Sequence, residues 1–240
     1  MEFAVDLHMH SALSPCSDKE MTPNNIVNMA VLKGLDFIAV TDHNSAENLE
    51  AICRCAGGTG LIVVPGMEIE TSEEIHLVCL FPDVAGALCV QDAIYASLPP
   101  FENREDIFGS QLVMDENDSV TGKIKRLLLA ASRMNTDEIF TLVENAGGVA
   151  IPAHVDRQSF SMLSNLGSIP EHLNIKYLEL SKDCDQYSFR AEHPELAAYK
   201  LLRSSDAHAL GGILERETFF ELEEKSIECL LRELKGRDTV

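Results

Sequence analysis

Short apolar runs alternate with helix-like stretches along this 240-residue chain, and this alternation limits the fold more than any other feature of the sequence. Short runs rich in apolar residues and bounded by turn residues are typical of buried strands. We expect strands at residues 3–7, 36–40, 61–64, 75–81, 148–151, 177–180 and 201–204. Strands that alternate with helices predict a mostly parallel sheet, either open and doubly wound or closed into an α/β barrel of seven or eight units.

The segments between these strands carry helix start and stop signals. Thr22 is placed to cap a helix that has Pro23 at its first position and stops at Gly34. Further helices are expected from a cap at Ser45 to Gly57, from Thr136 to Gly147, and over residues 226–236. Residues 82–133 contain no clear strand. We interpret them as an insertion with helical pieces, placed where a lid over an active site could sit.

Charge and composition suggest a soluble, cytoplasmic protein. The 19 basic and 39 acidic residues give a net charge of -20, which argues against long nucleic acid as a partner because affinity for the phosphate backbone comes mainly from Lys and Arg. No apolar run approaches the length of a membrane span, and no leader is apparent, so no membrane association is expected. The seven cysteines have no paired zinc spacing and are expected to be reduced thiols. The oligomeric state is not indicated.

Histidines gather where the expected strands end. Six of the eight lie at such ends: His8, His10, His43, His76, His154 and His208, with His76 early in its strand and therefore the loosest fit. Carboxylates lie at the same ends: Asp6, Asp42, Glu68 and Asp206. The carboxyl ends of strands carry the active sites of α/β barrels and open α/β sheets. His172 and His193 lie in helix or loop context and are assigned no function.

This set of side chains predicts a metal site with more than one ion. Imidazole and carboxylate ligands suit Zn, Mn or Fe, and Glu68 is the expected bridge between two ions. A structural zinc site is usually closed, four-coordinate and often rich in cysteine. Up to nine candidate ligands are too many for one structural ion, so an open, catalytic cluster is the better interpretation.

The ordered motifs resemble those of the polymerase and histidinol phosphatase (PHP) superfamily. In chain order they are DLHMHS at 6–11, TDHN at 41–44, PGMEI at 65–69, EIH at 74–76, PAH at 152–154 and SDAH at 205–208. The resemblance implies one domain over residues 1–240, a distorted (β/α)7 TIM-like barrel, and two or three divalent ions (Mn, Fe or Zn). The segments FGSQ at 108–111 and 152–157 look similar to those of short, stand-alone bacterial members.

The resemblance also implies a ligand set for each ion. The first ion would be held by His8, His10, Glu68 and Asp206, and the second by Glu68, His76 and His154. The third would take His43, His208 and a residue after the first motif, where family members have His or Asp. This chain has SPCSD at 14–18, so Asp18 is the expected ligand and the third site departs from the pattern.

The function implied is metal-dependent hydrolysis of a small phosphate ester, such as a nucleotide, a short oligonucleotide or a sugar or amino-alcohol phosphate. His208 and His43 are the expected acids toward the leaving oxygen if the third ion is absent. Arg157, Lys182 and Ser11 are the expected substrate contacts, although Arg157 could instead pair with Asp156. Asp6 and Asp42 are expected to orient histidines, and the role of Glu179 stays open. The alternatives are a non-catalytic metal-binding module and a metal-dependent amide or lactone hydrolase.

Overall fold

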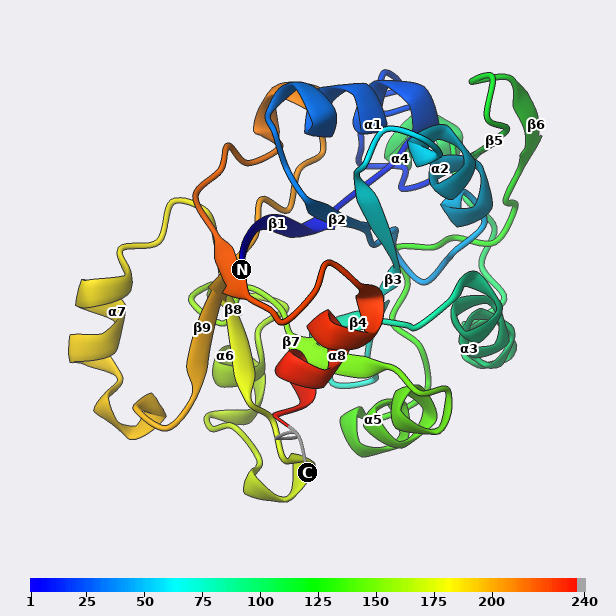
Figure 1. Ribbon diagram of the computed structural model, residues 1–240. Helices are drawn as coiled ribbons and strands as arrows, with labels where there is room; N and C mark the ends of the chain where they lie inside the picture. The colour runs from blue at the N-terminus through cyan, green and yellow to red at the C-terminus, as the bar shows by residue number, and fades with distance from the viewer. Residues whose placement is uncertain (237–240) are drawn as a thin grey trace.

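The computed structural model describes residues 1–236, so the last four residues of the expected domain lie outside the described part. The fold is mixed α/β and is built on a curled, half-barrel sheet (Figure 1). Its strand order is β10-β1-β2-β3-β4-β7. These strands are β10 (Phe219–Glu221), β1 (Glu2–Met9), β2 (Phe37–Val40), β3 (Ile62–Glu70), β4 (His76–Leu80) and β7 (Val149–Pro152).

A parallel pair, β8 (Tyr177–Leu180) and β9 (Lys200–Arg203), continues the curl beyond β7. The amide of Val155, just after β7, donates to the carbonyl of Glu179 in β8 at 2.8 Å. The amide of Asp206, after β9, donates to the carbonyl of His8 in β1 at 2.9 Å. The expected strands are therefore all present, while a closed barrel of seven units stays an expectation.

The direction of β4 corrects the expected parallel sheet. This strand runs antiparallel to β3 and to β7, with His76 paired to Glu70. The beginning of β4 consequently lies at the same edge of the sheet as the carboxyl ends of β3 and β7. His76, which is early in its strand, is for this reason beside the histidines that follow the other strands.

An apolar layer fills the concave side of the curled sheet. It includes Val5, Leu7, Phe37 and Val64 from the strands and Leu230 from α8 (Ile227–Lys235), all fully or almost fully buried. Met9 packs with a different cluster from Leu7, although residues two apart on a regular strand share a face. The register shift between β1 and β2 after Asp6 accounts for this change and turns His8 and His10 inward.

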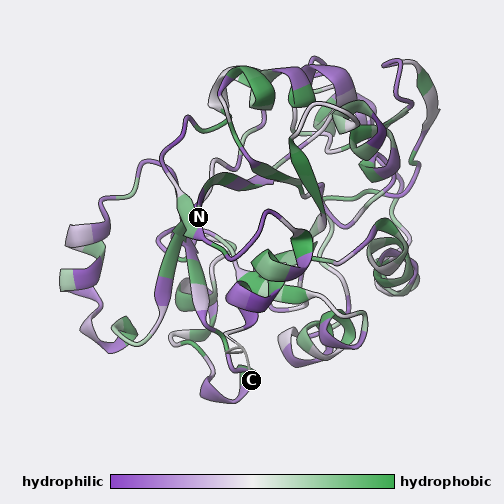
Figure 2. Cartoon of the chain, viewed as in Figure 1, coloured by the Kyte–Doolittle hydropathy of each residue, from purple (hydrophilic) through white to green (hydrophobic). Residues whose placement is uncertain are grey.

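Helices cover the outer face of the sheet, and the central strands are the more hydrophobic part of the chain (Figure 2). The larger ones are α1 (Pro23–Leu32), α2 (Leu49–Ala56), α3 (Val84–Ser97) and α5 (Thr136–Asn145). Thr22 caps α1 as expected. The expected cap at Ser45 is wrong, because α2 begins at Leu49 and the Ser45 hydroxyl instead contacts Gln91 and Tyr95.

Residues 82–133 are more ordered than the sequence indicates. The buried side of α3 packs in the main core, and β5 (Leu112–Met114) pairs with β6 (Val120–Lys123), so the expectation of no strand is wrong. These strands are short and β6 is mostly exposed, which hides their pattern. The segment packs on the loop after β1, with the amide of Leu112 donating to the carbonyl of Ala12 at 3.0 Å.

The remaining elements are short. They are α4 (Glu105–Phe108), α6 (Met162–Leu166), α7 (Gln186–Glu192) and the 3-10 turns η1 (Glu171–Leu173), η2 (Pro194–Leu196) and η3 (Leu210–Gly212). Among the helices of residues 1–236, none combines the length and the apolar character that a membrane crossing requires.

Candidate metal centre

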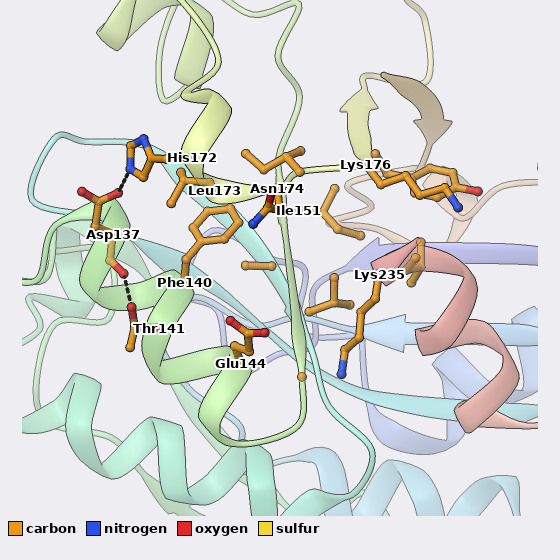
Figure 3. A pocket seen from close by; sticks show the side chains of 16 residues that line it. Asp137, Phe140, Thr141, Glu144, Ile151, His172, Leu173, Asn174, Lys176 and Lys235 are labelled. Atoms are coloured by element: carbon orange, nitrogen blue, oxygen red, sulfur yellow. Dashed lines mark hydrogen bonds and ion pairs between the residues drawn. The ribbon is translucent and has the colours of Figure 1, made fainter. Parts of the chain in front are cut away.

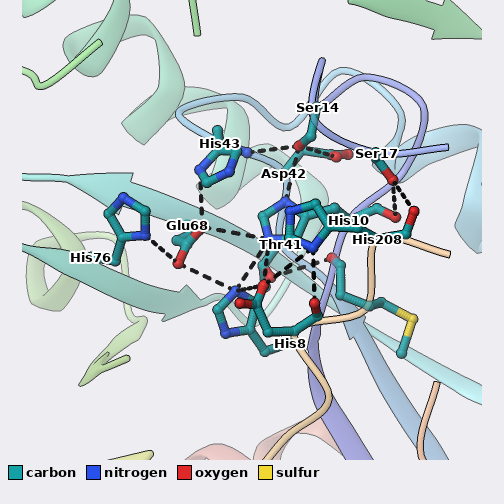
Figure 4. A network of polar contacts seen from close by, with 12 residues as sticks. His8, His10, Ser14, Ser17, Thr41, Asp42, His43, Glu68, His76 and His208 are labelled. Carbon is teal, nitrogen blue, oxygen red and sulfur yellow. Dashed lines mark hydrogen bonds and ion pairs between the residues drawn. The ribbon is translucent and has the colours of Figure 1, made fainter. Parts of the chain in front are cut away.

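Glu68 lies at the centre of a ring of imidazoles at the carboxyl edge of the sheet (Figure 4). Its carboxylate is 1% exposed, and five histidines direct a ring nitrogen toward it. The nitrogen-to-oxygen distances are 2.9 Å for His43 and His76, 3.3 Å for His8, 3.4 Å for His154 and 3.5 Å for His10. One carboxylate therefore faces more nitrogens than it could use in hydrogen bonds.

The donor atoms fit divalent metal ions. Both oxygens of Glu68 are buried, and none of the facing imidazole nitrogens in the described residues meets a good hydrogen-bond angle with them. The Nε2 atoms of His8 and His10 lie only 3.3 Å apart and 3.4 and 3.1 Å from a carboxylate oxygen of Asp206. Buried polar atoms normally have partners, and converging imidazole and carboxylate atoms suit Zn, Mn or Fe.

The pKa values of the two carboxylates, Glu68 and Asp206, also favour a cation at this site. Burial would raise the pKa of Glu68, but the facing His76, His8 and His43 hold it well below its usual range. Burial would likewise raise the pKa of Asp206, which His8 and His10 lower. Both carboxylates are therefore ionised and available to a cation.

Strained backbone accompanies two of these groups. His154 has φ 31° and Asp206 has φ 49°, in the left-handed region that side chains rarely adopt. Such strain persists only where the surroundings enforce it and is common at functional sites. Close packing also requires a glycine at position 66, two residues before Glu68. A Cβ on Gly66 would lie 2.7 Å from the methyl group of Thr41. A glycine thus lets β3 approach β2.

Hydrogen bonds fix the orientation of the histidine rings. Nδ1 of His8 donates to Glu179 at 2.9 Å, which leaves Nε2 to face Glu68. Nδ1 of His10 donates to the Ser14 hydroxyl at 3.0 Å, and Ser14 in turn donates to Asp42 at 2.7 Å. Carboxylates behind metal-binding histidines have this arrangement. Glu179, whose role the sequence left open, thus orients a candidate ligand, and Asp42 acts on His10 through Ser14.

Asp6 has a different role from the one expected. Its carboxylate accepts hydrogen bonds from the amides of Ser205 and Leu214, both at 3.0 Å, and contacts no histidine directly in the described hydrogen bonds. It therefore fastens the loop that carries Asp206 rather than orienting an imidazole.

We expect a Glu179→Gln variant to bind metal about 10- to 100-fold more weakly, because loss of a charged partner behind a ligand typically has this effect. Metal titration by calorimetry would measure the change. Glu195→Gln is the matched control, since Glu195 pairs with His193 at 3.1 Å in an exposed position. Equal affinities for both variants would contradict the role given to Glu179.

The donor atoms form three groups within 4.8 Å: His8, His10 and Glu68; His43, Glu68 and His76; and His10, His43 and His208. Asp206 adjoins the first group and His154 the second, through the contacts given above. The structure thus brings eight of the nine predicted ligands together. Asp18 is the exception, because it is exposed and belongs to none of these groups. The assignment of individual ligands to individual ions stays a prediction.

The structure places the three predicted substrate-binding residues in different surroundings. Arg157 lies at the rim, its guanidinium 2.8 Å from Asp206 and 3.1 Å from the Ser181 hydroxyl. It pairs with Asp206 and not with Asp156. Lys182 is exposed in the loop after β8. Ser11 is fully buried and donates to Asp42 at 2.6 Å, and its contact with substrate stays a prediction.

Sequence reasoning missed one side chain at this edge, the thiol of Cys16. Its side chain is exposed, and the rings of His208 and His43 lie near enough to act on its pKa. Desolvation would raise the pKa of this thiol, but those two imidazoles lower it to about 7. The signal was present in SPCSD at 14–18, but the assumption that the site uses no cysteine excluded it.

A cavity of about 620 Å³ lies elsewhere. It is lined by the beginning of β7, the residues before β8, and parts of α5 and α8 (Figure 3). These strand ends are at the edge of the sheet opposite to Glu68. His172, which was assigned no function, lines this cavity and pairs with Asp137 at 2.7 Å.

Comparison with known proteins agrees with this geometry. Residues 6–180 match the PHP domain. The chain belongs to the PHP domain family.

The similarities to individual proteins cover only part of those proteins. The 5'-3' exoribonuclease Rnm of Salmonella typhimurium is 37% identical over 87 residues, which are 33% of this chain and 28% of that protein. The lesion-specific endonuclease PfuEndoQ from Pyrococcus furiosus superposes with a TM-score of 0.74 at 20% identity, over 99% of this chain and 57% of that one. Endonuclease Q in complex with a 27-mer duplex substrate gives 0.72, with the same identity and coverage. The chain thus spans under a third of the exoribonuclease and little more than half of the endonuclease.

These relatives correct the expectation that excluded long nucleic acid. One is an exoribonuclease, and another binds a duplex with an abasic lesion at its active site. Net charge is a poor guide to such partners, because divalent ions, where they are bound, would neutralise phosphate locally whatever the sign of the remaining surface.

Proposed function

We propose that this chain is a metal-dependent phosphoric ester hydrolase with two or three divalent ions, acting on a small phosphate ester or on a phosphodiester of a nucleic acid strand. The observation that carries the proposal is the buried Glu68 carboxylate, faced by five imidazoles none of which, in residues 1–236, meets a good hydrogen-bond angle with it. The names of the nuclease relatives support phosphoesters as the substrate class.

Divalent ions, when bound, make water acidic enough to lose a proton near neutral pH and offset the charge that develops on a phosphoryl group. His8, His10, Glu68 and Asp206 would hold one ion, and Glu68, His76 and His154 a second, with His43 close to both Glu68 and His76. The protein's part is to fix these groups before substrate arrives, through Glu179 behind His8 and Ser14 behind His10.

Arg157 would bind and orient the phosphate. Its side chain is 42% exposed, and Asp206 and Ser181 hold the guanidinium at the rim. A planar guanidinium suits two phosphate oxygens.

His208 would hold the proton for the leaving oxygen whenever the third group of ligands binds no ion. Its side chain is 33% exposed. Nδ1 donates to the carbonyl of Asp206 at 2.9 Å, which leaves Nε2 for proton transfer. His43 is less suitable for this role, since it is buried against Glu68.

An Arg157→Ala variant is expected to lose about 10- to 100-fold in kcat/KM for phosphate esters, because charge-assisted hydrogen bonds contribute about 1.5–3 kcal/mol. Nitrophenyl phosphate, bis-nitrophenyl phosphate and a 5'-phosphorylated oligonucleotide would be the substrates. Arg104→Ala is the control, since Arg104 makes a similar exposed pair with Asp106. Turnover of amide or lactone substrates with none of phosphate esters would assign the site to carbonyl hydrolysis instead.

A further inference from the structure

Phe160 presents an aromatic ring beside the candidate metal centre. Its ring stacks on that of His76, with the ring centroids 4.7 Å apart and the planes 26° from parallel. Nδ1 of His76 in turn lies 2.9 Å from the Glu68 carboxylate, so Phe160 is one side chain away from the centre (Figure 4). Although Phe160 is a large apolar residue, it is 42% exposed. The ring thus contacts a candidate ligand and remains accessible from solvent.

The backbone of Phe160 is held in an unfavourable conformation. Its φ of 55° lies in the left-handed region, which bulky residues rarely adopt. The carbonyl of Phe160 accepts from the amide of His76 at 3.0 Å, and the Ser161 hydroxyl donates to the carbonyl of Val155 at 3.0 Å. Strain of this kind persists only where the surroundings enforce it and is common at functional sites. Burial of the ring is not what the strain achieves, because the residue is exposed.

The same loop carries two other groups of the proposed site. His154, at its beginning, faces Glu68 at 3.4 Å, and Arg157 lies at the rim with its guanidinium 2.8 Å from Asp206. Phe160 follows Arg157 by three residues. A loop with a candidate ligand, a phosphate-binding guanidinium and an accessible aromatic ring suits a phosphate ester that also carries a planar ring. Among phosphate esters, a nucleotide unit has this combination.

We propose that Phe160 stacks on the base of a nucleotide unit whose phosphate lies at the metal centre. The substrate is then a nucleotide or a nucleic acid strand rather than a sugar or amino-alcohol phosphate. The inference deepens the proposed function and rests on it for the position of the phosphate. Aromatic side chains stack on any base, because every base has a π-face. We therefore expect binding to depend on the presence of a base far more than on its identity.

Calorimetric titration tests this contact with two phosphonates, in which a methylene group replaces the ester oxygen and prevents hydrolysis. One is the analogue of adenosine 5'-monophosphate, and the other is the analogue of ribose 5-phosphate, which lacks the base. The whole protein, purified without chelator, is expected to bind the nucleotide analogue about 10-fold more tightly or better, because stacking of a base on an aromatic side chain typically contributes at least this factor. The uridine analogue should keep most of this advantage.

Two variants of Phe160 separate stacking on the substrate from packing on His76. Phe160→Leu keeps apolar bulk over the imidazole but has no π-face, so it should lose the preference for the base while metal content and affinity for the ribose analogue stay unchanged. Phe160→Tyr should retain the preference. Phe219→Leu is the matched control, because Phe219 is 45% exposed on β10, beside Ala4 near the beginning of β1 and so away from the carboxyl edge.

The proposal is overturned if the protein binds both phosphonates equally or binds neither. It is also overturned if Phe160→Leu keeps the preference for the base, or weakens binding of both phosphonates to the same extent. Equal weakening together with loss of metal would mean that Phe160 only positions His76. Binding of the phosphonates does not depend on turnover, so a lack of phosphoesterase activity would count against the proposed function and leave the result on Phe160 readable.

Discussion

A Glu68→Gln variant is expected to lose its bound ions and to hydrolyse phosphate esters about 1,000-fold more slowly, or worse. Glu68 faces the nitrogens of His8, His43, His76 and His154 at 2.9–3.4 Å, so it is the group that two ions would share. The amide keeps the size of the side chain but removes its charge. Metal ions contribute several kcal/mol of transition-state stabilisation, and each 1.36 kcal/mol is tenfold in rate.

Steady-state kinetics and metal content, measured on the same preparation, would check this prediction. Glu217→Gln makes the same chemical change at an exposed position and should behave as the parent protein. Unaltered secondary structure by circular dichroism would show that the loss is local. A Glu68→Gln variant that keeps both its ions and its turnover would contradict the central place given to this carboxylate.

Removal of metal is expected to lower the melting temperature by about 8–16 °C. The ligands come from β1, β3, β4 and the loops after β2, β7 and β9, so ions that hold them together bind the folded chain only. An ion at 1,000 times its dissociation constant adds about 4 kcal/mol, and each kcal/mol shifts the melting temperature of a chain this size by about 2–4 °C.

Calorimetric scans with and without chelator, at fixed protein concentration, would give the shift. The Glu68→Gln variant is the control, because it should melt at nearly the same temperature under both conditions. A parent protein that is indifferent to chelator and to added Mn or Zn would argue against ions bridging the strands.

The positions of the strands and of most converging groups follow from local sequence. Apolar runs identify a buried strand whichever way it points, and a histidine just after such a run lies at a sheet edge. The placement of His8, His10, Glu68 and Asp206 at one edge was therefore predictable.

The features that the sequence did not predict depend on the direction of a strand and on the shape of a loop. The antiparallel course of β4 is set by the short turn 71–75, and an apolar run does not encode it. In the loop after β1, the packing of Gly109 against Pro15 and the hydrogen bond from Leu112 to Ala12 set the course of the backbone, and the side chain of Asp18 stays exposed. Those contacts come from a segment about 100 residues away, beyond the reach of local pattern.

Elemental analysis of protein purified without chelator, with the same sample assayed on nitrophenyl phosphate and bis-nitrophenyl phosphate, tests the central claim most directly. We expect two or three ions per chain and turnover that disappears in a His10→Ala variant. One ion or none, with no turnover when Mn, Fe or Zn is supplied, would contradict a multinuclear phosphoesterase and leave a metal-binding module as the better account.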